Sequence, residues 1–288
     1  MNTPAAPTLA ELRRSPHWSA SALNAILNIC SLQWAFRSVW KIPPVFTPAA
    51  LTFGSVFHAA ASFAFRARLA GGDPAPATVL ELFGDLLSQE CRSSEVPVRF
   101  RDGDSLDAVI PQGQAMLSAL LADPVSRSGR VVAVGEAFSV PLPDIGGGGS
   151  RPLIGEYDLV IEDDGGIVIV DWKTAARRWP EGKADSDLQA TCYLYARSMS
   201  DPETGARFRF DIVTKTARPA VVHLETTRGE DRFRRLEALV GGVEALVRAE
   251  AFLPSEQSFA CSDCPYGEAC KAWHRCRTAH RVSFGTAA

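Results

Sequence analysis

Three charged side chains, Asp158, Asp171 and Lys173, stand inside or directly after two apolar strand-like runs near the middle of the chain. The runs cover residues 153–161 and 167–172, and the acidic and glycine residues between them predict the turn of a β-hairpin. Because strand side chains alternate between faces, Asp171 and Lys173 share one face with apolar neighbours. A charge in such surroundings needs a partner or a metal. Two aspartates holding a divalent cation, with a lysine steadying a nucleophile or a phosphate, would meet that need.

Other polar positions extend this pattern along the chain. In chain order, the motifs are Gly54-x-x-x-His58, Gly155-x-x-Asp158, Asp171-x-Lys173 and Gln189-x-x-x-Tyr193. The ordered set resembles the PD-(D/E)xK nuclease superfamily in its RecB-like branch. The resemblance covers nearly the whole chain, and it implies a metal-dependent DNA exonuclease with one restriction-endonuclease-like α/β domain, a central mixed sheet flanked by helices.

Phosphodiester hydrolysis needs a cation at the phosphate oxygens and an activated water molecule. We expect Asp158 and Asp171 to be the main metal ligands, with the backbone carbonyl of Trp172 as a third. Lys173 would orient the attacking hydroxide or stabilise the phosphorus centre. The resemblance adds His58 as a ligand, which would favour Mn²⁺ alongside Mg²⁺ because imidazole suits softer ions. Taken alone, His58 is better explained as a hydrogen-bonded core histidine.

Two further interpretations concern a helix and a strand. Gln189 and Tyr193 lie four residues apart on a predicted helix and so share a face. The resemblance implies that this pair positions the catalytic lysine and contacts the nucleic-acid backbone. Glu136 alternates with Val134 and Phe138 on one strand face, so an inward carboxylate there needs a partner. It could support the metal ligands, bind a second metal, or form a salt bridge to an arginine.

The chain has seven cysteines, and three of them crowd into Cys261-x-x-Cys264 and Cys270. In a protein without signs of secretion, such crowding favours metal ligation over disulfides. With Cys30, these residues resemble the iron–sulfur staple of CRISPR-associated and AddB-type RecB-like nucleases. The resemblance implies a [4Fe–4S] cluster, although four thiolates would also hold zinc. The cluster would clip the chain ends together and shape a channel for single-stranded DNA.

Cys276 offers an alternative to Cys30. Cys276 and the three neighbouring cysteines could form a purely local site, which would leave Cys30 as a buried apolar residue. We favour Cys30 because residues 19–34 also resemble the opening helix of the family. The match has one departure, since Ser31 stands where a proline often follows the first cysteine.

The 288 residues are 46% hydrophobic and 22% charged, as in an ordinary globular protein with a full core. No apolar run reaches membrane-spanning length and the start lacks the apolar core of a signal peptide, so we expect a cytoplasmic protein. The net charge of −3 lacks the basic signature of many nucleic-acid binders. A local basic groove remains compatible with it. Candidate basic positions are Arg13, Arg14, Arg66, Arg68, Arg177, Arg178, Lys183, Arg207 and Arg209.

The periodicity predicts helices and strands that form a single domain over residues 16–288 after a loose tail at 1–15. Helices are expected near 19–34, 53–69, 78–91, 104–121, 187–199 and 230–251. Strands are expected near 132–140, 153–161, 167–172, 207–214 and 220–225, with a flexible loop at 144–150. The cysteine-rich C-terminal segment is expected to pack on the N-terminal helix.

The pattern as a whole predicts an exonuclease that acts on single-stranded DNA ends, because an enclosed site admits a threaded strand more easily than a duplex. The chain lacks a G-x-x-x-x-G-K-[ST] phosphate loop, so a helicase, recombination or CRISPR-adaptation partner is expected to supply the motor. One alternative is a non-catalytic DNA-binding or scaffolding subunit that keeps the fold. Another is a zinc-dependent module with an unrelated hydrolase activity.

Overall fold

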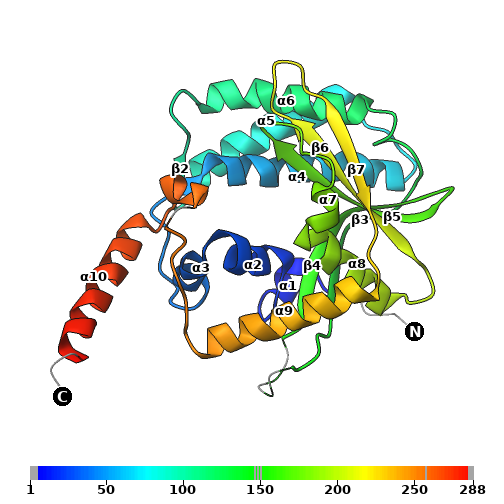
Figure 1. The fold of residues 1–288 in the computed structure, drawn as a ribbon. Helices are drawn as coiled ribbons and strands as arrows, with labels where there is room; N and C mark the ends of the chain where they lie inside the picture. The colour runs from blue at the N-terminus through cyan, green and yellow to red at the C-terminus, as the bar shows by residue number, and fades with distance from the viewer. Residues whose placement is uncertain (1–5, 146, 148, 150, 257, 285–288) are drawn as a thin grey trace.

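The computed structural model describes residues 6–145, 147, 149, 151–256 and 258–284. At its centre is a five-stranded sheet with the strand order β3-β4-β5-β6-β7 (Figure 1). The strands are β3 (Arg130–Val140), β4 (Leu153–Asp163), β5 (Gly166–Ala175), β6 (Ala206–Thr214) and β7 (Val221–Thr226). β5 and β6 run parallel, and the other neighbours pair antiparallel. The sheet is therefore mixed, as expected.

Helices cover both faces of the sheet (Figure 1). One layer contains α4 (Ala49–Leu69), α5 (Pro76–Ser93) and α6 (Leu106–Ala122), which share a core with Val168, Val170 and Trp172 of β5. The other layer contains α8 (Leu188–Ser200), α9 (Glu230–Arg248) and the N-terminal helices, which share a core with Phe208 and Phe210 of β6. Two helical layers around one sheet confirm the single α/β domain.

The predicted hairpin is formed by β4 and β5, which pair antiparallel. Gly166 closes its turn with φ 98°, a backbone conformation that glycine adopts without steric cost. The pairing of the two strands ends at Leu159 and Val170. Asp158 and Asp171 follow directly beyond that last pair, so both carboxylates stand where the two strands separate.

The N-terminal helix is interrupted, in contrast to the continuous helix expected for residues 19–34. Ser19 caps α2 (Ala20–Asn24), a π-helical segment η1 (Ala25–Cys30) follows, and α3 spans Ser31–Ser38. Cys30 is extended, with φ −168°, and its sulfur accepts a hydrogen bond from the backbone N–H of Gln33. Cys30 therefore caps α3, and it does not continue the apolar stripe of the preceding helix.

The C-terminal segment returns to α3, as expected. The backbone N–H of Leu253 donates to Ser31 Oγ at 2.9 Å, and Ser31 Oγ donates to the Leu253 carbonyl at 3.0 Å. Further along, η2 (Phe259–Asp263) leads to Tyr266, whose ring lies 5.9 Å from that of Phe36. Beyond this contact, α10 (Gly267–Phe284) extends away from the body of the protein (Figure 1).

A buried ionic network ties β6 and β7 to the loop after α6. Arg209 and Asp211 are 2% and 0% exposed, and Arg209 Nε donates to Asp211 Oδ1 at 2.7 Å. His223 reaches both carboxylates of the network, with Nδ1 2.7 Å from Asp211 Oδ1 and Nε2 2.9 Å from Asp123 Oδ1. Burial disfavours a charged imidazole, but Asp211 and Asp123 outweigh it and raise the pKa of His223. Both ring nitrogens face acceptors, which requires the doubly protonated ring.

The predicted loose tail at 1–15 contains the short helix α1 (Leu9–Leu12), capped by Thr8 and Glu11, while residues 1–5 lie outside the described part. Positions 146, 148 and 150 of the predicted loop also lie outside it. A separate pair of short parallel strands joins β1 (Thr47–Pro48) to β2 (Val98–Arg99). Within the described residues, no helix is long and apolar enough to cross a membrane.

Candidate active site and cysteine cluster

The end of the hairpin brings the predicted charges together. Asp171 is 2% exposed, and Lys173 Nζ lies 2.6 Å from Asp171 Oδ2. Gln189, from α8, contacts both side chains. Its Oε1 accepts a hydrogen bond from Lys173 Nζ at 2.8 Å, and its Nε2 donates to Asp171 Oδ1 at 2.5 Å. The amide of Gln189 therefore fixes the carboxylate and the ammonium relative to each other.

Asp158 is held from two directions. Its Oδ1 lies 3.1 Å from Nδ1 of His58 on α4, and its Oδ2 accepts a hydrogen bond from the backbone N–H of Trp172 at 3.0 Å. The His58 ring packs edge-to-face against the Trp172 ring at 5.9 Å. The upstream histidine, 100 residues away in sequence, is thus adjacent to the first carboxylate of the hairpin.

Burial and opposite charges set the protonation of this group. Burial raises the pKa of Asp171 to about 6, with Lys173 opposing the shift and Asp158 adding to it. Burial disfavours the charged forms of Lys173 and His58. For both cations the neighbouring carboxylates outweigh burial and raise the pKa. The carboxylates therefore stabilise positive charge at this end of the hairpin.

These side chains line one cleft of about 580 Å³, which Tyr193 also enters. The Tyr193 ring lies 5.3 Å from that of Phe138 and 5.6 Å from that of Tyr157. Burial raises the pKa of the Tyr193 phenol well above its usual value, so the phenol stays protonated. Gln189 and Tyr193 share a face of α8 toward the cleft, as their spacing predicts.

Gly155, three residues before Asp158, has a structural reason to be glycine. A Cβ atom at this position would lie 2.4 Å from an atom of the Phe138 ring. That ring stacks 4.7 Å from the Tyr157 ring. The missing side chain therefore lets an aromatic group pack against the back of the strand that carries Asp158.

Glu136 differs from the sequence-based expectation. The structure places it exposed on β3, and it does not line the cleft. The pairing of β3 with β4 shifts between Val131 and Ala133, and Gly135 has a left-handed φ of 65°. This shift precedes Val134, and the register with β4 is regular from there to Val140, so Glu136 keeps the alternation of the buried Phe138 and Val140. The strand face is covered at those two residues, but it is exposed at Glu136.

The cleft contains residues that the sequence pattern did not single out as site residues. They include Leu9, Ser19, Glu156, Trp179 and Asp187. Asp187 caps α8 by accepting the backbone N–H of Gln189 at 2.9 Å, and its position before a helix was a detectable signal. Trp179 lies in a connection without periodicity, where no signal was available.

Four of the nine candidate basic positions show two different environments. Arg13 and Lys183 line the cleft, and Lys183 Nζ lies 4.4 Å from the ring centre of Trp179. Arg207 and Arg209 are instead paired with the carboxylates of Asp163 and Asp211. The cleft thus receives cations from α1 and from the start of α7 (Lys183–Ser186).

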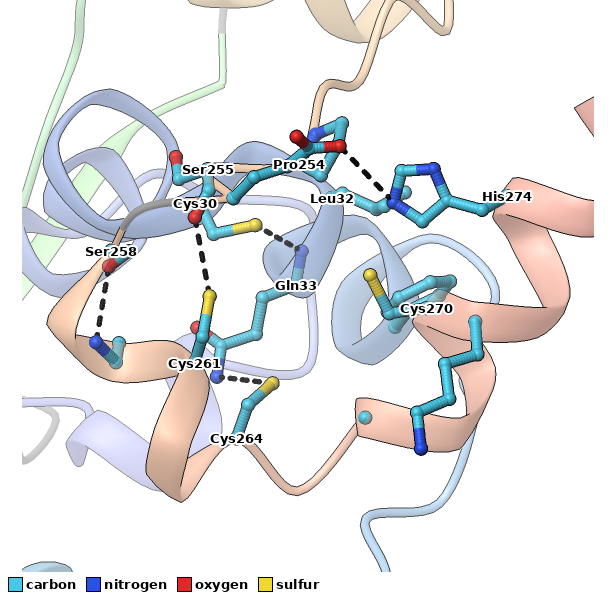
Figure 2. A pocket seen from close by; sticks show the side chains of 15 residues that line it. Cys30, Leu32, Gln33, Pro254, Ser255, Ser258, Cys261, Cys264, Cys270 and His274 are labelled. Carbon is cyan, nitrogen blue, oxygen red and sulfur yellow. Dashed lines mark hydrogen bonds and ion pairs between the residues drawn. The ribbon is translucent and has the colours of Figure 1, made fainter.

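Four cysteines line a second cavity, of about 160 Å³, formed by α3, η2 and the start of α10 (Figure 2). They are the predicted set, Cys30, Cys261, Cys264 and Cys270. Cys276 is exposed and is not part of the lining. The cavity therefore groups Cys261, Cys264 and Cys270 with the distant Cys30 and not with the nearby Cys276.

Gln33 supports two of the sulfur atoms. Its backbone N–H donates to Cys30 Sγ at 3.4 Å and its side-chain Nε2 donates to Cys264 Sγ at 3.6 Å (Figure 2). Burial raises the pKa of Cys264 and of Cys270, and the neighbouring cysteines add to both shifts. Four thiolates at this place would repel one another unless a positive centre lay between them.

Neither predicted ligand set is assembled as a closed metal cage. No three His, Cys, Asp or Glu side chains within the described ranges are grouped so that they could hold a metal ion. At the hairpin, Asp171 Oδ2 is engaged by Lys173 Nζ at 2.6 Å, so a cation at this carboxylate would share it with the lysine. Two carboxylates suffice for Mg²⁺, because substrate phosphates and waters complete its shell.

The fold and the matched length identify the class of protein. The model of the PD-(D/E)XK nuclease superfamily matches residues 17–271, and the chain belongs to this superfamily. Its members generally use divalent metals.

A solved structure shares the fold at low sequence identity. The crystal structure named "Putative exonuclease" from Eubacterium rectale aligns with a TM-score of 0.55 at 13% identity, over 91% of this chain and 93% of that chain. The structure of SSO0001 aligns with a TM-score of 0.42 at 14% identity, over 89% of this chain and 86% of that chain. No curated protein matches the sequence.

Proposed function

We propose that this protein is a metal-dependent exonuclease that hydrolyses phosphodiester bonds at single-stranded DNA ends. The observation that carries the proposal is the linked group of Asp171, Lys173 and Gln189 beside Asp158, in one cleft of a PD-(D/E)XK chain. A helicase, recombination or CRISPR-adaptation partner would supply the strand.

Asp158 and Asp171, with the backbone carbonyl of Trp172, would hold Mg²⁺ or Mn²⁺. Such an ion, when bound, neutralises phosphate oxygens and lowers the pKa of a bound water. The position of both carboxylates at the end of the hairpin, where they line one cleft, supports this assignment. His58, 3.1 Å from Asp158, would add an imidazole ligand that suits Mn²⁺.

Lys173 would orient the attacking water and stabilise the charge that develops on the phosphoryl oxygens. The water oxygen attacks phosphorus, the ester P–O bond breaks, and the leaving oxygen takes up a proton. Gln189 keeps the ammonium in place through its 2.8 Å hydrogen bond. Tyr193, with its protonated phenol in the cleft, would contact the nucleic-acid backbone.

The four cysteines around the second cavity would hold a [4Fe–4S] cluster, with zinc as the alternative occupant. Hydrogen bonds from Gln33 to two of the sulfur atoms support thiolate ligation. The role of this group would be structural, because the cavity joins residues near position 30 to residues 261–270. Ligation would therefore clip the two ends of the domain together.

The test uses labelled linear single-stranded DNA with Mg²⁺ or Mn²⁺ and three variants of the full chain. Asp171→Asn and Lys173→Ala should abolish digestion while keeping the melting profile of a folded protein. Arg235→Gln removes an exposed cation on α9 that lines neither cleft, and it should digest normally. Digestion by either site variant at the native rate would refute the assigned site. Cleavage of a circular single strand would refute the exonuclease assignment.

A further inference from the structure

A third cavity, of about 380 Å³, lies beside the start of α4 and the carboxyl ends of β5 and β6. Its lining includes Ala50, Phe53, Arg99, Arg101, Thr174 and Lys215. Three cations and two carboxylates, Asp104 and Asp263, surround it. The active-site network does not use any of these residues.

Lys215 is the most informative residue of this cavity. It follows β6, and its backbone N–H is fixed by a 2.8 Å hydrogen bond to the Ala175 carbonyl. Its ammonium lies 4.0 Å from the ring centre of the buried Phe53. Among the described residues, no carboxylate lies within ion-pair distance of Nζ. Asp104 lines the same cavity and acts on Lys215 only at longer range. A half-buried ammonium without a direct ion pair is stabilised further by an anion that enters the cavity.

The opposite wall is built by an ion pair with the cysteine-rich segment. Arg99 lies 2.5 Å from Asp263 Oδ1, and its guanidinium packs 3.3 Å from the ring centre of Phe46. Arg101 Nε lies 3.9 Å from the second oxygen of Asp263, and the side chain is 77% exposed. Asp263 thus neutralises Arg99. Arg101 keeps most of its donors free, so it can bind an anion other than the Asp263 carboxylate.

The cavity and the active-site cleft are lined by neighbouring residues at the end of β5. Lys173 lines the cleft, and the next residue, Thr174, lines the cavity. Because successive strand residues face opposite sides, the two spaces lie on opposite faces of the same strand end. A flexible polyanion that leaves one space can therefore enter the other around this end.

We propose that this cavity binds a backbone phosphate of the DNA strand, a few nucleotides from the bond that is cut, through Lys215 and Arg101. The proposal rests on the nuclease function above and extends it to a second contact with the same strand. A single strand fits this role because its backbone bends, whereas a duplex is too wide and stiff to follow the turn around β5. Phosphate contacts of this kind position a strand without reading its sequence.

The test compares Lys215→Gln and Arg101→Gln with the matched control Arg235→Gln. Binding of a labelled 12-nucleotide single strand is measured by fluorescence anisotropy in EDTA, so that no strand is cut. Turnover of the p-nitrophenyl ester of thymidine 5′-monophosphate, which occupies only the cleft, is measured separately with Mn²⁺. Melting temperatures show that each variant is folded.

Each of the two variants should weaken binding of the 12-nucleotide strand about 5- to 10-fold, and the slope of log affinity against log salt should fall by about 0.7. Turnover of the small ester should stay at the native rate. Arg235→Gln should change neither quantity.

Three results would overturn the proposal. The first is native 12-nucleotide affinity in both variants. The second is an equal loss of ester turnover, which would make the cations part of the cleft itself. The third is that a mononucleotide binds the native protein as tightly as the strand does, and that its affinity falls by the same factor in the variants. This result would indicate a pocket for free nucleotides. If the proposed nuclease function is wrong, the native protein will turn over neither the ester nor DNA. Strand binding in EDTA will still test the cavity, so the two failures can be told apart.

Discussion

Gly155→Ala should destabilise the fold because the new methyl group has no room. Its Cβ would lie 2.4, 2.7 and 3.2 Å from three atoms of the Phe138 ring. That ring is held between Tyr157 and Tyr193, with centroid distances of 4.7 and 5.3 Å, so it cannot retreat freely. Overpacking typically costs about 1–3 kcal/mol. Since the crowded atoms belong to a three-ring cluster, we expect the upper part of that range, about 2–3 kcal/mol.

Denaturant and thermal unfolding measure this loss. At about 2–4 °C for each kcal/mol in a domain approaching this size, the Tm should fall by about 4–12 °C. Gly242→Ala is the matched control, because Gly242 is exposed inside α9 and a Cβ there meets no heavy atom within 4 Å. The same added methyl group should raise stability by about 0.5–1 kcal/mol at that position.

A double-mutant cycle isolates the contact. In the Phe138→Leu background, the smaller side chain leaves space for the methyl group, so Gly155→Ala should cost at least about 1 kcal/mol less than in the native background. Native stability of Gly155→Ala, or the same loss in both backgrounds, would refute the explanation. The glycine of the motif would then need a reason other than the ring.

Three further predictions concern metal ligands and pH. Cys30→Ser should remove the bound iron, or zinc, and lower the Tm, whereas Cys276→Ser should leave metal content and Tm unchanged; the reverse result would indicate a local C-terminal site. His58→Ala should raise the Mn²⁺ concentration needed for half-maximal cleavage if the imidazole is a ligand, and unchanged metal dependence with a lower Tm would show a purely structural histidine. His223 has a raised folded-state pKa, so its contribution to stability is complete below its unfolded pKa of about 6.5 and is lost as the pH rises through the folded-state pKa. His223→Gln should therefore flatten the dependence of unfolding free energy on pH above neutrality, and an unchanged dependence would argue against the charged ring.

Much of the sheet was predictable because its signals are local. The alternating runs of the hairpin and the turn at Gly166 specify two neighbouring strands without any long-range information. The interruption of the N-terminal helix was not predictable in this way. An apolar stripe at helical spacing, including Leu27 and Cys30, suits a continuous helix equally well, yet Leu27 is 40% exposed and Cys30 turns away to cap α3. Cys30 Sγ also contacts the backbone carbonyl of Leu253, which lies 223 residues later.

In the candidate site, too, local signals were readable from the sequence and the effects of distant elements were not. Asp158, Asp171 and Lys173 belong to one hairpin, so strand parity was enough to bring them together. Glu136 was predicted by the same parity, and it keeps the alternation of the buried Phe138 and Val140, but its own part of the strand face is exposed. Parity tells which face a residue occupies, and it does not tell how far along the strand other elements cover that face.

The joining of the two chain ends has a consequence for synthesis. Ser31 bonds to a residue 222 positions later, and Trp34 packs 6.0 Å from Phe252. A ribosome therefore adds 218 residues after Trp34 before it reaches Phe252. Until then, the aromatic face of the first helices is uncovered and open to chaperones or to self-association. Fragments that stop before Phe252 should accumulate as aggregates, even though every strand of the sheet has already been made.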